Sequence, residues 1–218
     1  MLPVKQQPTH MLTAKVRRAI DFRQRTDFRS INRMSDLFFK ETSNYRSPYD
    51  FLALAVINRA ACLTRAFCDL MRTRNFLAAA PLTRIHLDSA LRLAAPSISG
   101  SEDEVIDKML RGARLDTLTT HSGVRLTDGF LVRQLARLHP WVAALYETAS
   151  GYVHLSVAHV RAAFRKDAEG PFSFKVSDED LWVSERTYLS VIKLFGDVTR
   201  LIELEIAEHY KRMTDSGR

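Results

Sequence analysis

Residues 81–96, PLTRIHLDSALRLAAP, carry the clearest structural pattern in the chain. Apolar residues recur at helical spacing between two prolines, so the stretch predicts a helix over about residues 77–95. Arg84, Asp88 and Arg92 follow one another at intervals of four residues and therefore share one side of this helix. Because the surrounding segment is apolar, we expect that side to face a protein interior or a cleft, where polar groups must pair or bind a ligand.

A second polar stripe runs through residues 145–156, LYETASGYVHLS. Tyr146, Ser150 and His154 are again spaced i, i+4, i+8, which places them on one face of a helix, and His159 follows shortly after. A histidine titrates near neutral pH and, beside a hydroxyl group, can perform general acid–base chemistry. The alternative is a buried histidine that is hydrogen-bonded to an arginine or a tyrosine as part of the core.

The first stripe carries more positive than negative charge. Two guanidinium groups, those of Arg84 and Arg92, flank the single carboxylate of Asp88. A buried excess of positive charge needs another acid, a carbonyl group or an anionic ligand. Asp69 is the expected acid, because the helix that carries it should pack antiparallel against the helix over residues 77–95. We therefore interpret the stripe as either a structural ion-pair network or a site for phosphate or another anion.

Apolar periodicity predicts further helices along the chain. Short connections between long amphipathic helices favour an all-α fold, an antiparallel helical bundle of about six or seven helices. The β-prone segments on either side of the turn-like KDAEG predict a small β-hairpin near residues 159–176. We divide the chain into a basic N-terminal helical arm, residues 1–46, and a helical bundle, residues 47–218. The expected helices cover residues 11–42, 49–72, 77–95, 101–111, 129–139, 141–157 and 184–213.

The composition is that of a soluble globular protein, since 46% of the 218 residues are hydrophobic and 26% are charged. No apolar run approaches the roughly 20 residues that span a bilayer, and the N-terminal residues lack the pattern of a secretory signal. We therefore expect a cytoplasmic protein with no membrane partner. Cys62 and Cys68 lie six residues apart in a predicted helix, about 120° around its axis, so we expect two buried thiols and no disulfide.

The chain lacks the motifs of the common cofactor and metal enzymes. It has no glycine-rich phosphate loop, no His-Glu-x-x-His, no Cys-x-x-Cys and no aspartate-rich calcium loop. His154 and His159 are five residues apart, about 140° around a helix, and do not form a two-histidine metal face. We therefore expect no cofactor and no metal ion.

Positive charge is concentrated towards the N-terminus. Residues 1–100 hold 16 basic and 7 acidic side chains, a net +9, whereas residues 101–218 hold 16 basic and 18 acidic side chains, a net −2. Such a concentration can bind a polyanion such as nucleic acid. The alternatives are a solvated helical face or an arm that packs on a partner subunit. The candidate nucleic-acid-binding residues are Arg17, Arg18, Arg25, Arg29 and Arg33.

The order of the two stripes resembles that in bacterial helical proteins related to the HEPN superfamily. Those proteins carry an Arg-x-x-x-Asp/Glu element on one central helix and a Tyr-x-x-x-Ser-x-x-x-His element two or three helices later. The resemblance spans roughly residues 50–210 and implies an all-α, usually dimeric protein. Many HEPN domains are metal-independent RNases of toxin–antitoxin or phage-defence systems, and others are binding modules. The matching residues here are Arg84, Asp88, Tyr146, Ser150 and His154.

This resemblance implies cleavage of RNA without a metal ion. His154 would exchange a proton with the 2′-hydroxyl or the leaving oxygen, and Arg84 or Arg92 would stabilise charge on the phosphate. The basic N-terminal helix would hold part of the RNA backbone, which makes binding sensitive to salt. The implied partners are RNA, a second copy of the chain in a homodimer, and an antitoxin or other protein. The candidate catalytic residues are His154, Arg84, Arg92 and Ser150, and the surrounding polar network is Asp69, Asp88, Tyr146 and His159.

Active HEPN domains carry an arginine about four to six residues before the histidine. Ser150 occupies that position before His154, whereas Arg133 and His139 match the pattern literally at the end of the preceding predicted helix. Two other classes of function stay open. One is a non-catalytic dimerisation or interaction module whose polar stripes fix helix register. The other is a bundle that clamps a small anion between the two arginines of the first stripe.

Overall fold

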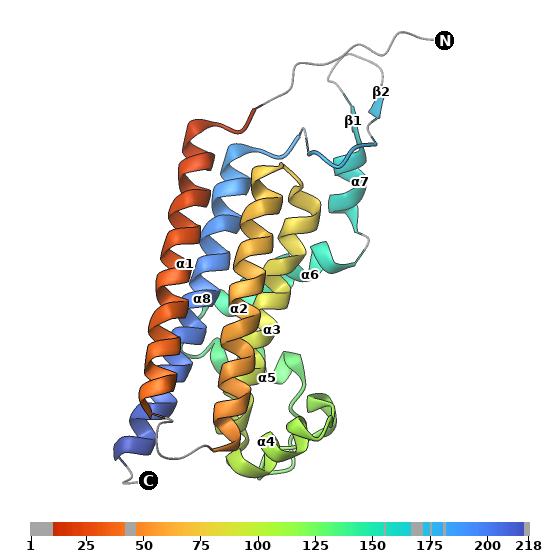
Figure 1. The fold of residues 1–218 in the computed structure, drawn as a ribbon. Helices are drawn as coiled ribbons and strands as arrows, with labels where there is room; N and C mark the ends of the chain where they lie inside the picture. Colours follow the sequence, from red (N-terminus) through yellow and green to blue (C-terminus); the bar gives the residue numbers. More distant parts are fainter. Residues whose placement is uncertain are drawn as a thin grey trace.

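A computed structural model describes residues 11–41, 47–154, 156–166, 172–174, 176–180 and 182–215. This part of the chain is almost entirely helical (Figure 1), which confirms the expected all-α class, and its two strands are three residues long. The elements are α1 (Ala14–Glu41), α2 (Pro48–Arg72), α3 (Phe76–Ser99), α4 (Glu102–Leu110), the 3₁₀ helix η1 (Leu115–Thr117), α5 (Asp128–Leu135), α6 (Trp141–Val153), α7 (Val157–Ala163), β1 (Phe164–Lys166), β2 (Phe172–Phe174) and α8 (Glu185–Asp215).

Four long helices, α1, α2, α3 and α8, lie side by side (Figure 1). The first three alternate in direction. In contrast, α8 runs parallel to α1, since Lys15 and Arg33 of α1 pair in the same order with Glu185 and Glu203 of α8, at 3.5 and 2.6 Å. The expectation of an antiparallel bundle is therefore wrong for α8. The segment from α4 to β2 carries the chain back to the end of the body at which α3 begins, so α8 also runs parallel to α3.

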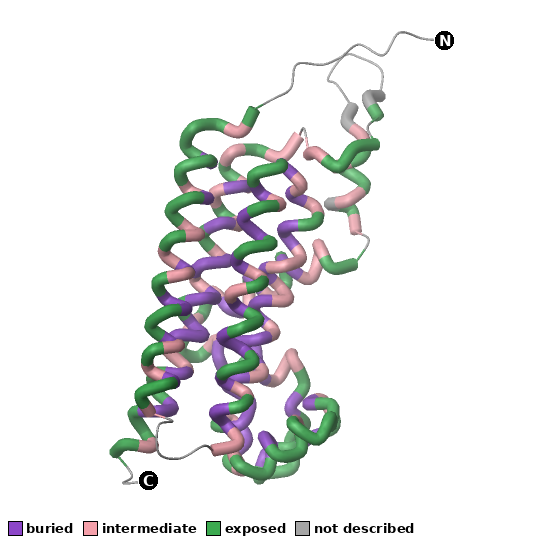
Figure 2. Tube along the Cα trace, viewed as in Figure 1, coloured by how far each residue is buried: buried purple, intermediate pink, exposed green. Residues whose placement is uncertain are grey.

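The core lies along the facing sides of these helices (Figure 2). Helix α1 contributes to two hydrophobic clusters: Val16 and Ile20 pack in one of them with Phe195, whereas Met34 and Phe38 pack in the other. Full burial of side chains of this size stabilises the fold by about 1.5–3 kcal/mol each. The basic N-terminal segment therefore has a core face as well as a charged face.

Helix α3 carries the first polar stripe and is longer than expected. It continues through Pro96 to Ser99 and ends where Gly100 adopts a left-handed conformation with φ 74°. A proline inside a helix costs about 3 kcal/mol, because it removes one hydrogen bond and crowds the preceding turn. Leu93 and Ala95 are buried beside it, so burial of the last turn offsets this cost.

The segment expected to form a β-hairpin is partly helical. Val157–Ala163 form α7, in keeping with the helix preference of alanine and arginine. Phe164–Lys166 and Phe172–Phe174 then pair as two short antiparallel strands, and residues 167–171 between them lie outside the described residues. The expectation of a strand before residue 164 is therefore wrong.

Helix α2 differs from expectation in two respects. Its length and composition would allow it to cross a membrane, with a mean hydropathy of 1.5 over 18 residues, although core helices of globular proteins pass the same test. In this fold α2 packs against α1, α3 and α4. Cys68 is buried, as expected, but Cys62 is exposed, so the expectation of two buried thiols is wrong for Cys62.

Candidate functional site

The polar stripe of α3 faces the side of the body on which α5 and α6 pack. The side chains of Arg84 and Asp88 are 14% and 17% exposed, and that of Arg92 is 36% exposed. The stripe is thus set at a partly desolvated surface, as the apolar sequence around it predicts. Groups at such depth interact more strongly than they would at a fully solvated surface.

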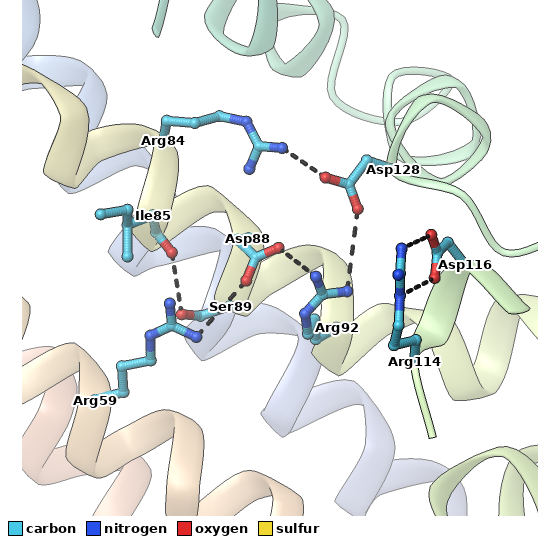
Figure 3. A network of polar contacts seen from close by, with 9 residues as sticks. All are labelled: Arg59, Arg84, Ile85, Asp88, Ser89, Arg92, Arg114, Asp116 and Asp128. Atoms are coloured by element: carbon cyan, nitrogen blue, oxygen red, sulfur yellow. Dashed lines mark hydrogen bonds and ion pairs between the residues drawn. The ribbon is translucent and has the colours of Figure 1, made fainter. Parts of the chain in front are cut away.

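Two carboxylates hold the guanidinium groups of this stripe (Figure 3). Asp128, the first residue of α5, lies 2.6 Å from Arg84 and 4.0 Å from Arg92 through its two oxygens. Asp88 lies 2.9 Å from Arg92 and 3.6 Å from Arg59 of α2. Three cations therefore share two acids, and the network retains a net positive charge.

Asp69 does not join this network. Its carboxylate is 55% exposed and pairs with Arg72 at 3.0 Å. Helices α2 and α3 are antiparallel and Arg59 lies opposite Asp88, so Asp69, ten residues beyond Arg59, lies about 15 Å further along α2. The prediction that Asp69 balances the stripe is therefore wrong, and Asp128 takes that place.

The second stripe meets the first across the gap between α3 and α6. The guanidinium carbon of Arg84 lies 4.3 Å from the centre of the Tyr146 ring, a cation–π contact. The Ser150 hydroxyl donates a 2.6 Å hydrogen bond to the Tyr146 carbonyl one turn earlier. His154 follows the last residue of α6, has an extended backbone conformation and is exposed. The helix therefore carries two of the three predicted residues, and the third stands at its end.

Together these residues line one open cleft of about 380 Å³. His159 lies outside it on α7, where its Nδ1 accepts a 3.2 Å hydrogen bond from the Ser156 backbone N–H and its ring lies 6.5 Å from that of Tyr152. Arg92 points from the same network into an adjoining groove. The cleft-lining residues are Arg59, Arg84, Ile85, Asp88, Asp128, Tyr146, Ser150, Val153 and His154.

The literal Arg–His match does not form part of this cleft. His139 lines a separate groove against α8, beside Trp141 and Arg200. The Arg133 guanidinium extends back along α5 to Gly129, 3.6 Å from the position that a β-carbon there would occupy. The two matching side chains therefore point towards different parts of the surface.

The candidate nucleic-acid-binding arginines of α1 are exposed, but they lie on another side of the body. Helix α1 packs on α2 and α8 (Figure 1), whereas the cleft is lined by residues of α3, α5 and α6, by Arg59 of α2 and by His154. Arg33 is also engaged by α8, since Glu203 accepts two hydrogen bonds from it, at 2.6 and 3.1 Å. An RNA that contacted both α1 and the cleft would therefore have to extend from one side of the body to another. The exposed arginines are Arg17, Arg18, Arg25, Arg29 and Arg33.

The sequence patterns missed a buried polar group between α1, α3 and α8. Asp27 is fully buried and lies 2.6 Å from Arg23, and burial raises the pKa of its carboxyl to about 6. His86 is also fully buried, shares a 3.0 Å hydrogen bond with Thr199, and has its pKa lowered by burial to about 3. The Arg23 guanidinium occupies the space that a β-carbon at Gly196 would need, so a larger residue there would displace this group. These groups are enclosed by the core and serve packing.

A second missed group ties the start of α4 to the end of α8. His209 is buried, stacks on Tyr49 with ring centres 3.4 Å apart, and has its Nδ1 2.8 Å from a carboxylate oxygen of Glu102. This contact lowers the pKa of the Glu102 carboxyl. The Tyr210 hydroxyl donates a 2.8 Å hydrogen bond to Asp50 beside it. The arrangement fixes α4, and through it the loop that leads to Asp128.

Within the described residues, no cluster of three or more His, Cys, Asp or Glu side chains could hold a metal ion. Comparison with known proteins gives no matching family model, no matching curated protein and no matching solved structure.

Proposed function

We propose that the chain is a HEPN-like protein that acts on RNA and binds a phosphodiester in the cleft between α3 and α6. One observation carries this proposal: Arg59, Arg84 and His154 come from three different helices or helix ends and line the same open cleft. Guanidinium groups recognise phosphate through paired hydrogen bonds, and an exposed imidazole beside them can transfer protons. The two stripes resemble those of HEPN proteins, and this resemblance implies that the phosphodiester bound in the cleft belongs to RNA.

The ion pairs of the cleft leave donors available for a phosphate. Arginine has five N–H donors, and Arg84 uses one terminal nitrogen in its contact with Asp128. Its position is set by that contact and by the Tyr146 ring, so little side-chain entropy remains to be lost on binding. The same groups could stabilise the charge that develops on phosphate oxygens during cleavage.

Cleavage needs two proton transfers. The 2′-oxygen attacks phosphorus and the bond from phosphorus to the 5′-oxygen breaks, which gives a 2′,3′-cyclic phosphate and a 5′-hydroxyl end. His154 accepts the 2′-hydroxyl proton or donates a proton to the leaving oxygen, and water performs the other transfer. The Ser150 proton is directed at the Tyr146 carbonyl, so the Ser150 oxygen can accept a hydrogen bond but not donate one to the substrate.

The test is a cleavage and binding assay with end-labelled single-stranded RNA in EDTA. We expect products with cyclic phosphate ends, and His154→Gln should slow cleavage by at least about 100-fold while RNA still binds. His139→Gln is the matched control, because His139 lines a different groove. Loss of cleavage in His139→Gln with full activity in His154→Gln would overturn the assignment.

A second candidate, a non-catalytic interaction module whose polar stripes fix helix register, is favoured by the pairing within the cleft. Each of Asp88 and Asp128 is within 4.0 Å of two guanidinium groups, as in a structural network. Such a protein would bind RNA or a partner without cutting it, whereas a bundle that clamps a small anion would gain melting temperature with phosphate or pyrophosphate. We also propose two protein partners, a second copy of the chain and an antitoxin-like protein. Sedimentation with and without RNA tests whether the chain forms a homodimer.

A further inference from the structure

A larger groove of about 670 Å³ adjoins the cleft and shares Asp128 and Tyr146 with it. It lies between the end of α3, the loop after α4 and the start of α5. Its volume is within the range of about 300–1,000 Å³ that small-molecule sites occupy. None of the chemistry described for the cleft uses this groove.

The groove has an apolar wall and a rim of paired charges. Met109, Tyr146 and the largely buried Leu115 form the wall. Arg92 and Arg114 also line the groove, together with Asp128 and Asp116, with which they pair. A flat base can lie on such a wall while the attached phosphate meets a guanidinium group, which is how single-stranded nucleic acids are commonly held.

The guanidinium groups follow one another from the cleft into the groove (Figure 3). Arg84 belongs to the cleft, Arg92 is joined to it through Asp128 and lines the groove, and Arg114 stands beyond. Asp116 holds Arg114 through two hydrogen bonds of 3.1 and 2.6 Å. The row therefore provides cationic groups for consecutive phosphates.

We propose that the groove lined by Arg92 and Arg114 is a second nucleotide subsite, so that the protein takes single-stranded RNA with at least two consecutive phosphates. The inference rests on the proposed function of the cleft. A base must leave its stack to reach the apolar wall, and a base-paired A-form helix keeps its bases stacked. Duplex RNA would therefore meet only the rim.

The chain offers a matched pair of arginines for the test. Arg114 and Arg111 are 80% and 78% exposed, and each is paired with a nearby acid, Asp116 at 2.6 Å and Asp107 at 3.0 Å. Only Arg114 lines the groove. A general effect of charge would therefore appear in both alanine variants, and a subsite would appear in one.

The experiment measures fluorescence anisotropy of labelled oligouridylates of one to six nucleotides and of a 12-base-pair RNA duplex. We expect the affinity of the wild type to rise between one and three nucleotides, and to be lower for the duplex. Arg114→Ala should remove most of this rise and weaken binding of the longer oligomers about tenfold, because a hydrogen bond to a charged group is lost. Arg111→Ala should change the affinity less than twofold.

The outcomes separate the subsite from the cleft. Equal effects of Arg114→Ala and Arg111→Ala, or equal affinity for duplex and single strand, would overturn the second subsite. If the second subsite is overturned but Arg84→Ala weakens binding in the same experiment, the assignment of the cleft still stands. If Arg84→Ala leaves RNA affinity unchanged, the proposed function itself is wrong.

Discussion

Replacing Gly196 by alanine should destabilise the core around the buried Asp27. A β-carbon at residue 196 would occupy the space of the Arg23 guanidinium, so this end of the side chain must shift, and we expect it to lose its 2.6 Å contact with the Asp27 carboxylate. Asp27 is 0% exposed, and breaking a buried ion pair by removing one partner costs about 3–5 kcal/mol. Alanine in a helix recovers about 0.5–1 kcal/mol relative to glycine, so we expect a net loss of about 2–4 kcal/mol.

Gly151→Ala is the matched control, since a β-carbon at this helical glycine would meet no atom within 4 Å apart from its chain neighbours and the backbone of its own helix, and the variant should gain about 0.5–1 kcal/mol. Urea unfolding followed by circular dichroism measures both variants. With a slope of about 1–3 kcal/mol per molar urea, the midpoint of Gly196→Ala should fall by about 0.7 M or more. A midpoint at or above that of the wild type would refute the role given to Arg23 and Asp27.

Three further predictions concern the paired and buried groups. Asp128→Asn removes an acid that competes with phosphate for Arg84, an ion pair of about 0.5–1 kcal/mol. We expect RNA affinity to rise about two- to fivefold in anisotropy titrations, and weaker binding would contradict this. Burial lowers the pKa of His86 to about 3 in the folded state, so below about pH 6.5 only the unfolded state takes up this proton and the protein loses stability. Burial raises the pKa of Asp27 to about 6, so between about pH 6 and 4 the folded state takes up the proton first and the protein gains stability. Urea titrations should therefore show that the free energy of unfolding falls more between pH 7 and pH 5 in Asp27→Asn than in the wild type, and falls less in His86→Gln. The reverse order would contradict the assignment. Cys62 should react with a thiol reagent in the folded protein, whereas Cys68, buried and with its pKa raised to about 12, should react only on unfolding; rapid reaction of two thiols would exclude this packing.

Features with a local cause could be predicted from the sequence. The apolar periodicity located the long helices, and the spacing of four residues correctly placed Arg84, Asp88 and Arg92 along one side of α3. Tyr146 and Ser150 likewise share a side of α6 and line the same cleft. These patterns depend only on helix geometry, which any helix of this sequence must obey.

Features that depend on which helices meet could not be predicted in the same way. Asp128 follows a helix-capping Thr127, and that signal predicts a helix start but not the arginine that the carboxylate meets. Arg23 and Asp27 lie four residues apart on α1, so their pairing is local, but the burial of Asp27 and its contact with Thr199 depend on the packing of α1 against α8. His154 leaves the predicted stripe because α6 ends one residue before it.

The most direct test of the central claim is to observe the histidine side chains while single-stranded RNA binds. The chain has seven histidines, and the ring signals of His154 and His139 can be assigned from their glutamine variants by ¹H–¹³C NMR. We predict that RNA shifts the His154 signals, since this ring lines the cleft with Arg84, and leaves those of His139 in place. RNA binding that shifts His139 and leaves His154 unchanged would contradict the assignment of the cleft.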